Sequence, residues 1–422
     1  MAQSTIGLIV LAIVLVLYMI PQIPLSVTTI FAMIAMAVTG IISYADVFSG
    51  FANSATLLVA GMMVIGHACF TSGLAEWFGG LLFKFVGANE KLFVIMILVI
   101  ASLLAVVVNG ALVVAMLMPI IDSIVYQSKG TITRKHCYFP LGLASTLGNN
   151  LTTISATSMI TASGLVAAAG YGQMSLFAPT VLNLPALLVV IILYAIFGYK
   201  LQQRWFDFEE QPYEMPEEQF EIKTFSKCKM VITAVVLIGV VTGLLAGMNY
   251  GACALCGVVI LIFSGCIDES TAYRCISWPT IIIVAGSMGF SKGLEASGAG
   301  EIIANTIIEL SGPVGQSGLG ICMILFLAGS LLSNLMSDNA SVAILVPIAI
   351  ALGRKMGGDV MPLVLAAASG IKVAVATPIS VVTMTMVETA GYRFKDYLRM
   401  GGLVNIVAMV VTGLVIKFVY FM

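Results

Sequence analysis

Charged residues are scarce in this chain: Asp, Glu, Lys and Arg make up only 9% of its 422 residues, whereas 60% are hydrophobic. Soluble proteins carry roughly 25% charged residues. The shortage excludes a soluble globular domain and predicts an all-α, polytopic membrane protein. The formal net charge of −1 provides no basic surface of the kind that binds nucleic acid.

Catalytic motifs are also missing. No HExxH segment, no paired carboxylates and no nucleophile beside a base lie in the apolar runs, so we do not expect an enzyme. No nucleotide-binding motif is present, so transport would use an ion gradient or a counter-substrate. Cys253 and Cys256 form a C-x-x-C without a second pair, which indicates packing rather than a metal or redox site. We expect no cofactor.

Apolar runs of about 20 residues predict membrane-spanning helices. The first run, residues 6–20, lacks the basic segment and the cleavage site of a signal peptide, so we expect it to be retained. Two runs, 92–126 and 318–352, are too long for one span and too short for two, and a polar tip interrupts each. We expect both to be re-entrant hairpins. The other expected helices cover residues 5–20, 24–45, 54–85, 139–172, 177–200, 229–247, 250–266, 276–311, 361–395 and 401–421.

One long polar stretch, residues 201–228, separates the halves 1–200 and 229–422. We expect it to be a cytoplasmic, amphipathic linker. Cytoplasmic loops carry an excess of Lys and Arg, and most basic loop residues fall inside if the N-terminus lies outside. Arg354 and Lys355 are the main exceptions. The pattern predicts a multi-pass protein of the plasma (inner) membrane.

The two halves share a pattern at a constant offset of 225 residues, at which VAGMM (59–63) matches VAGSM (284–288). Because the first unit contains five expected spans, an odd number, the second unit would start on the opposite face. We therefore predict two inverted repeats, each with five transmembrane helices and one hairpin. Further matches at this offset are Ser72 with Ser297, Gly73 with Gly298, Glu76 with Glu301, Thr152 with Thr377 and Ser155 with Ser380.

Small and polar residues interrupt the apolar pattern twice in each half, at the hairpin tips and within 141–159 and 366–384. A helix break at membrane depth is tolerated only where protein or a water-filled cavity covers it. Paired breaks in two repeats point to a transporter's binding site. Free N–H groups at helix N-termini attract anions, and free C=O groups at C-termini attract cations. Helix packing through small and polar residues is the alternative interpretation.

These breaks resemble a known family. The segment ASTLGNNLT (144–152) is similar to the first broken helix of the divalent anion:sodium symporters. SDNA (337–340), with Pro347 ten residues after the Ser, resembles their second hairpin tip. ATPI (376–379), followed by GYRFKD (391–396), resembles their second broken helix and its exit. The resemblance implies an elevator-type homodimer that carries dicarboxylates or related anions, usually with sodium.

With this resemblance, two sets of binding residues are expected. Those expected to contact the substrate are Asn109, Gly110, Thr152, Ser155, Thr157, Ser337, Asn339, Thr377, Ser380 and Thr383. Those expected to contact the coupling ion, Na⁺, are Asn109, Gly148, Asn150, Ser337, Asp338 and Ala376. Neutral oxygens and amide donors suit both carboxylates and hard cations.

The chain also departs from the family's pattern. Val-Asn-Gly (108–110) and Ser-Asp-Asn (337–339) stand where the family has Ser-Asn-Thr. The family's Gly-Thr-Pro-Pro-Asn has become Ser-Ala-Thr-Ser-Met (155–159) and Ser-Val-Val-Thr-Met (380–384). Both copies have changed in parallel, so the substrate stays open among succinate, malate, fumarate, oxoglutarate, citrate and sulfate.

Lys372 lies at a polar position of the second break. A charge at the membrane midplane costs at least ~2.5–3.5 kcal/mol, so it needs a partner, and Asp338 in the adjacent tip is the expected one. One hypothesis places the Lys372 ammonium in a second sodium position, with Asp338 as its counter-charge; the alternative is a purely structural role.

Two further charged or titratable positions correspond at the same offset. His67 aligns with Lys292, and it either transfers protons or is a structural histidine bonded to a carbonyl. Lys292 and Glu295 are expected to pair across one helical turn.

The sequence thus predicts a sodium-coupled secondary transporter of di- or tricarboxylate-type anions that works by an elevator mechanism. The alternative is a sodium-independent exchanger or a proton-coupled anion carrier, with Lys372 in place of a sodium ion. A carrier of the wider superfamily, for arsenite or Na⁺/H⁺, agrees less well with the second break. Expected partners are the anion, membrane lipid and a second copy of the chain.

Overall fold

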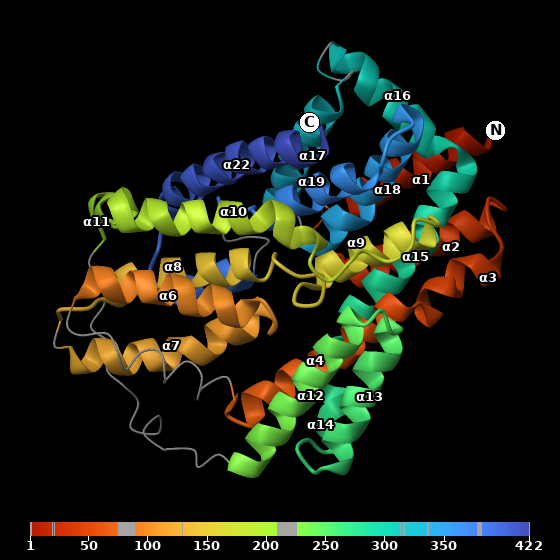
Figure 1. Ribbon diagram of the computed structural model, residues 1–422. Helices are drawn as coiled ribbons and strands as arrows, with labels where there is room; N and C mark the ends of the chain where they lie inside the picture. Colours follow the sequence, from red (N-terminus) through yellow and green to blue (C-terminus); the bar gives the residue numbers. More distant parts are fainter. Residues whose placement is uncertain are drawn as a thin grey trace.

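The computed structural model is helical, and no strand occurs in the part of the chain that it describes (Figure 1). The described residues are 2–18, 20, 22–74, 89–128, 130–208, 226–312, 314, 317–335, 337–377 and 382–421.

The first half consists of helices joined by short connections. They are α1 (Gln3–Tyr18), α2 (Leu25–Val38), α3 (Tyr44–Phe48), η1 (Ser49–Ala52), α4 (Ser54–Thr71), α6 (Glu90–Ala105), α7 (Gly110–Gln127), α8 (Arg134–Gly148), α9 (Thr157–Ala168), α10 (Ala178–Leu193), η2 (Tyr194–Gly198) and α11 (Tyr199–Trp205). The expected helix over 54–85 is described only as far as residue 74.

The helices of the second half follow the same order as those of the first, but their lengths and the short elements between them differ. Its elements are α12 (Lys227–Leu245), α13 (Tyr250–Phe263), α14 (Glu269–Arg274), α15 (Trp278–Ser297), α16 (Ala299–Leu310), α17 (Gly318–Leu335), α18 (Asp338–Met356), α19 (Met361–Lys372), α20 (Val382–Met386), η5 (Val387–Ala390), α21 (Phe394–Asp396), η6 (Tyr397–Gly401) and α22 (Gly402–Tyr420).

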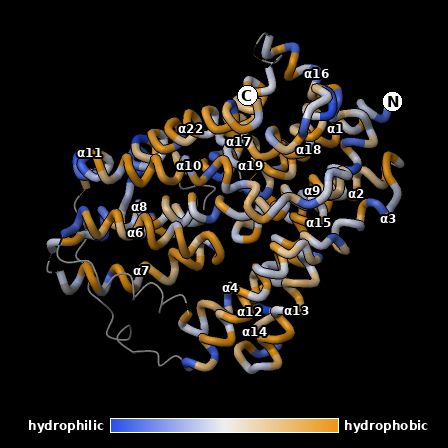
Figure 2. Tube along the Cα trace, in the orientation of Figure 1, coloured by the Kyte–Doolittle hydropathy of each residue, from blue (hydrophilic) through white to orange (hydrophobic). Residues whose placement is uncertain are grey.

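Several of these helices are long and apolar enough to cross a membrane. Five segments meet both conditions among the described residues: 44–71, 178–205, 227–245, 338–356 and 394–420. In Figure 2, hydrophobic residues run along the outer faces of α10, α12 and α22. Large side chains exposed there include Ile192, Val235 and Ile406. Exposed apolar faces of this length suit contact with lipid rather than with water.

Both predicted hairpins are helix pairs with a capped turn. The Asn109 side chain accepts a hydrogen bond from the Ala111 N–H (3.0 Å) at the start of α7. The Ser337 hydroxyl accepts one from the Ala340 N–H (3.3 Å) at the start of α18. Asn and Ser stabilise a helix N-terminus in this way, because the first N–H groups of a helix have no partner within it.

Both predicted helix breaks are confirmed. α8 ends at Gly148 and α9 begins at Thr157, and α19 ends at Lys372 before α20 begins at Val382. The two breaks are not copies of each other. α9 has 12 residues, whereas α20 has five and continues into a 3₁₀ turn.

The prediction of one helix over 276–311 is wrong. α15 ends at Ser297 and α16 begins at Ala299. Gly298 lies between them in the left-handed conformation, with φ of 74°. Glycine adopts this conformation without a Cβ clash and so commonly ends a helix. The expected ion pair of Lys292 with Glu295 is also wrong, because Lys292 bonds to Asp46 and Ser49 and Glu295 pairs with Arg354.

Equivalent helices of the two halves pack in equivalent ways. α6 packs on α8 as α17 packs on α19, and α4 packs on α13 as α15 packs on α2. Glycines permit the closest of these contacts. A Cβ at Gly148 would lie 2.3 Å from the Ser102 carbonyl oxygen, and one at Gly370 would lie 2.1 Å from that of Phe326. The opposite orientation of the two units in a membrane stays a prediction.

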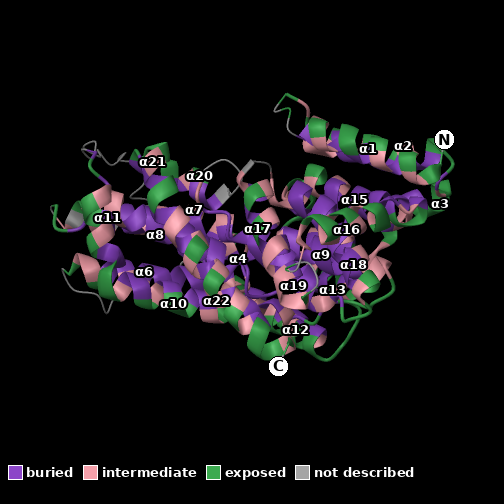
Figure 3. Ribbon diagram, turned by 90° about the horizontal axis from the view of Figure 1, so that it is seen from above, coloured by how far each residue is buried: buried purple, intermediate pink, exposed green. Residues whose placement is uncertain are grey.

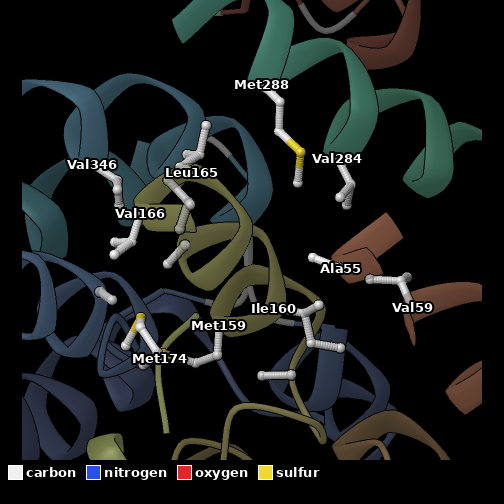
Figure 4. Close-up of a cluster of buried hydrophobic side chains, with 14 of the residues drawn as sticks. Ala55, Val59, Met159, Ile160, Leu165, Val166, Met174, Val284, Met288 and Val346 are labelled. Atoms are coloured by element: carbon white, nitrogen blue, oxygen red, sulfur yellow. The ribbon is translucent and has the colours of Figure 1, made fainter. Parts of the chain in front are cut away.

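α9, the helix that follows the first break, lies within a cluster of buried hydrophobic side chains (Figure 4). Its Met159, Ile160 and Leu165 belong to a buried cluster with Val59 of α4 and Met288 of α15. α18 packs on it as well. Figure 3 shows buried residues along α8 and α9 and exposed ones along α1 and α10. The first break is therefore enclosed by protein on several sides, as a break at membrane depth requires.

The predicted linker is partly folded onto the protein. Phe206 and Phe208 are buried, and both contact the ring of Tyr392. Asp207 accepts hydrogen bonds from Lys395 at 3.1 Å. The rest of the predicted linker, residues 209–225, lies outside the described part of the chain.

A polar network fixes the other end of the first hairpin. The Glu90 carboxylate accepts hydrogen bonds from the Thr133 N–H (2.8 Å), the Thr133 hydroxyl (2.7 Å) and the Tyr199 hydroxyl, and lies 3.1 Å from His136 Nδ1. Burial raises the pKa of Glu90. The hydrogen bonds from His136, Tyr199 and Thr133 outweigh this effect and lower the pKa to about 2. Glu90 is thus ionised in the folded protein.

Candidate functional site

The first hairpin tip lies against both helix breaks. A Cβ at Gly110 would lie 2.9 Å from the Ser145 carbonyl oxygen in α8 and 3.2 Å from Thr383 Cγ2 in α20. The Thr152 hydroxyl donates to the Val106 carbonyl (2.6 Å), which connects the tip to the first break from the other side. The tip is therefore held in place by two segments that the sequence separates widely.

The first break is stabilised by its own hydroxyls. Ser155 Oγ donates to the Asn149 carbonyl (3.0 Å) and lies 3.1 Å from Thr152 Oγ1. Thr152 and Ser155, both expected substrate contacts, thus have partners within the protein. Ser155 in addition lines a pocket described below.

Other polar atoms of the first break are buried and find no hydrogen-bond partner among the described residues. They are Ser145 Oγ, Asn149 Oδ1, Asn150 Oδ1, Asn150 Nδ2 and Thr153 Oγ1. An unpaired buried polar group costs about 1–3 kcal/mol, so such a cluster is unusual unless a ligand or water contacts it. Neutral oxygens of this kind suit a hard cation such as Na⁺.

The predicted pair of Lys372 and Asp338 joins the second break to the second hairpin tip. Lys372 Nζ lies 2.8 Å from Asp338 Oδ2, and Ser333 Oγ donates to Asp338 Oδ1 at 2.6 Å. The Lys372 side chain is 9% exposed and that of Asp338 15%. The ammonium lies at the C-terminal end of α19, where the helix dipole also favours a positive charge.

The second break faces α17 and α22. The Thr377 hydroxyl lies 3.2 Å from both the carbonyl and the side-chain oxygen of Asn334. Ala376 lies beside Gly401, next to the start of α22. Ala376 and Thr377 therefore contact neighbouring helices, and Ser380 lies outside the described residues.

Two hydrogen bonds join the halves at these breaks. The Thr157 hydroxyl, at the start of α9, donates to Asn339 Oδ1 at the start of α18 (3.3 Å). Thr146 Oγ1 of α8 lies 2.5 Å from Thr383 Oγ1 of α20. Asn109 and Thr157 line one pocket, described below, and Thr157 bonds to Asn339 beside it. The helices α7, α9 and α18 begin at or next to these three residues.

A pocket of about 240 Å³ opens beside this region. A pocket of this size has room for a small anion. The predicted residues that line it are Asn109, Ser155 and Thr157. Its other walls are Val59, Met62, Met63, His67, Val107, Ala111, Leu112, Ile154, Ile160, Cys275 and Ser277.

Sequence reasoning missed several polar residues around the breaks. Ser330, Ser333 and Asn334 lie on one face of α17, and Asn334 Nδ2 donates to the Ser330 carbonyl (2.7 Å). Asn405 of α22 reaches the backbone around Val373. The spacing of the three α17 residues (i, i+3, i+4) was the available signal for a polar helix face.

Comparisons with known proteins agree with this architecture. A family described as "Citrate transporter" matches residues 9–370. This chain belongs to that family. The resemblance to anion:sodium symporters is thereby confirmed at the level of ion transporters, and these proteins are transporters rather than enzymes.

Several relatives resemble the transporter. It is 27% identical over 207 residues to an uncharacterized transporter of Synechocystis, covering 49% of this chain and 33% of the relative. It is 26% identical over 200 residues to sodium/sulfate cotransporter 1 of Chlamydomonas reinhardtii, covering 46% and 23%. The transporter thus spans a third or less of the length of these relatives. An uncharacterized transporter of Haemophilus influenzae is 22% identical over 420 residues, covering 96% of this chain and 89% of that one.

A solved structure shares the fold. The YdaH transporter of Alcanivorax borkumensis superposes with a TM-score of 0.62 at 12% identity, covering 91% of this chain and 88% of that one. The described part of the chain therefore shares the helical fold of that protein, and five of its helical segments are long and apolar enough to cross a membrane.

Proposed function

We propose that this transporter carries small anions with two or more negative charges across the membrane by secondary active transport, with di- and tricarboxylates as the principal substrates and sulfate as a further candidate. The meeting of the N-termini of α7, α9 and α18 beside the pocket supports this proposal. Among the described residues, the N-termini of α7 and α9 contribute to the pocket lining. Each contributes about +0.5 of a charge, so the two contribute about +1. A dianion would then leave about one negative charge for a cation to compensate.

We propose Na⁺ as the compensating ion at the first break. The unpaired oxygens of Asn149 and Asn150 supply suitable ligands, next to Gly148 in the break that Thr152 connects to the first hairpin tip. Relatives named as sodium/sulfate cotransporters support the same choice of ion and add sulfate to the candidate substrates.

At the second break, the observed ion pair favours a different arrangement. Ser337, Asp338 and Ala376 were expected to contact sodium, but the Lys372 ammonium lies on the Asp338 carboxylate. We propose that Lys372 replaces a second sodium ion. The transporter would then couple to fewer sodium ions, or act as an exchanger or a proton-coupled carrier.

The larger arrangement is also a proposal. The units 1–200 and 229–422, joined by the cytoplasmic linker 201–228, would form inverted repeats that move the hairpins and broken helices as an elevator in a homodimer. The N-terminus would face outward across the plasma (inner) membrane.

Uptake into liposomes tests the proposed function. Purified transporter should accumulate labelled succinate, citrate or sulfate, and replacing external sodium with choline should lower the rate. Thr157→Val removes the hydroxyl that bonds to Asn339 and should weaken apparent affinity about five- to tenfold. The matched control is Thr161→Val on the same helix, whose hydroxyl bonds to the Thr157 carbonyl (2.8 Å). Absence of saturable uptake for all three anions would refute the proposal.

A further inference from the structure

The pocket beside the breaks has one wall from α4, and that wall contains a histidine. His67 lines the pocket together with Asn109, Ser155 and Thr157. Within the part of the chain that the structure describes, no Lys, Arg, Asp or Glu lines it. Cys275 is the one other lining residue that titrates. His67 is therefore the side chain of the pocket that can provide a full positive charge near neutral pH.

The equivalent position in the second half supports a cationic role. His67 corresponds to Lys292 at the offset of 225 residues. Lys292 Nζ bonds to Ser49 Oγ (2.9 Å) and lies 3.6 Å from Asp46 Oδ1, so a carboxylate compensates its charge. No carboxylate lines the pocket with His67 in the described structure. A positive charge on His67 would thus be available to a bound anion.

The charged residues on the elements that pack on α4 do not provide another cation for the pocket. The helices that pack on α4 are α7, α9, α12, α13 and α15, together with the turn η1. Asp122 of α7 pairs with Arg134 at 2.7 Å. The titratable residues of these elements are Asp122 and Tyr126 of α7, Lys227, Cys228 and Lys229 of α12, Tyr250, Cys253 and Cys256 of α13, and Lys292 and Glu295 of α15. None of these residues lines the pocket.

We propose that protonated His67 contacts the anion from the α4 wall, so that binding of a dianion takes up a proton at this side chain. This inference rests on the proposed function. The helix N-termini leave a bound dianion short of about one positive charge, which either the sodium ion proposed above or an imidazolium on His67 would supply. Neutral imidazole would still offer a hydrogen bond but no charge, so the affinity for the anion should rise when the side chain takes up a proton.

Anion binding by the purified full chain tests this proposal. Sulfate and ethane-1,2-disulfonate are suitable probes because both stay doubly negative over the range studied, so any pH dependence belongs to the protein. Wild-type protein should bind them roughly tenfold more tightly at about pH 5.5 than at about pH 8. His67→Gln should bind weakly at both pH values, and His67→Lys should bind tightly at both.

The chain offers a matched control, since it contains two histidines. His136 bonds to Glu90 and Thr133 and does not line the pocket, so His136→Gln should keep the wild-type pH dependence. Binding that is equal at both pH values in wild type, or pH dependence that persists in His67→Gln, would overturn the role of His67 while leaving the proposed function intact. Failure of wild type to bind sulfate, ethane-1,2-disulfonate, succinate or citrate at any pH would overturn both.

Discussion

Removing the Lys372 ammonium leaves the Asp338 carboxylate without a cation in a site where it is only 15% exposed. Asp338 would keep the hydrogen bond from Ser333 but lose the contact to Nζ at 2.8 Å. If the ammonium occupies the place of a sodium ion, Lys372→Met creates a site that sodium can fill. The variant should therefore become more dependent on sodium than the wild-type protein.

The size of the effect follows from the burial of the pair. Breaking a buried ion pair by removing one partner costs about 3–5 kcal/mol, because the remaining charge stays desolvated. A sodium ion bound at about 100 times its Kd restores about 2.7 kcal/mol. Lys372→Met should accordingly be much less stable than wild type in choline chloride and recover most of the difference in sodium chloride.

Thermal unfolding of purified protein in detergent, at equal ionic strength in the two salts, measures this response. Lys355→Met, at an exposed lysine of α18, is the control for loss of a positive charge. The double variant Lys372→Met with Asp338→Asn removes both charges, so it should lie within about 1–2 kcal/mol of wild type and show no extra sodium response.

A variant Lys372→Met that is as stable as wild type in choline would show that the ion pair contributes little. Loss of stability without any additional rescue by sodium would show that Lys372 is a structural partner of Asp338 and not a substitute for the ion.

Three further predictions follow from particular contacts. Gly148→Ala should destabilise the protein by about 1–3 kcal/mol or prevent folding, because its Cβ would lie 2.3 Å from the Ser102 carbonyl oxygen. Gly402→Ala is the control, because its Cβ meets open space, and this substitution should be tolerated. Expression yield and thermal melting measure both variants. Asn339→Ala and Thr157→Val should be non-additive in anion affinity because the two side chains share a hydrogen bond, and additive effects would contradict that contact. Glu90 has a pKa of about 2 in the folded protein against an ordinary value of 4.5, so its contribution to stability is present above about pH 4.5 and disappears as the pH falls toward 2. The stability deficit of Glu90→Gln relative to wild type should therefore shrink over that range. A deficit that stays constant would refute the lowered pKa of Glu90.

Local features of the fold were predictable from the sequence. Apolar runs gave the helices, and polar tips gave both hairpins, because Asn109 and Ser337 cap the helices that directly follow them. Lys372 required a partner at membrane depth, and Asp338 was the charged residue at the facing tip. The single helix predicted over 276–311 failed because one glycine with positive φ, Gly298, outweighed the apolar pattern around it.

Other features depended on tertiary packing. Thr157 and Asn339 are 182 residues apart, and no local pattern indicates that the starts of α9 and α18 meet. Thr377 matches Thr152 in sequence, yet it bonds to Asn334 of α17 rather than facing the pocket. His67 lies in an ordinary apolar helix, and only the packing of α4 beside α7 and α9 places it at the pocket wall. Hydrophobic periodicity and capping are properties of sequence neighbours, whereas the composition of a pocket is decided by which helix faces meet after the chain has folded.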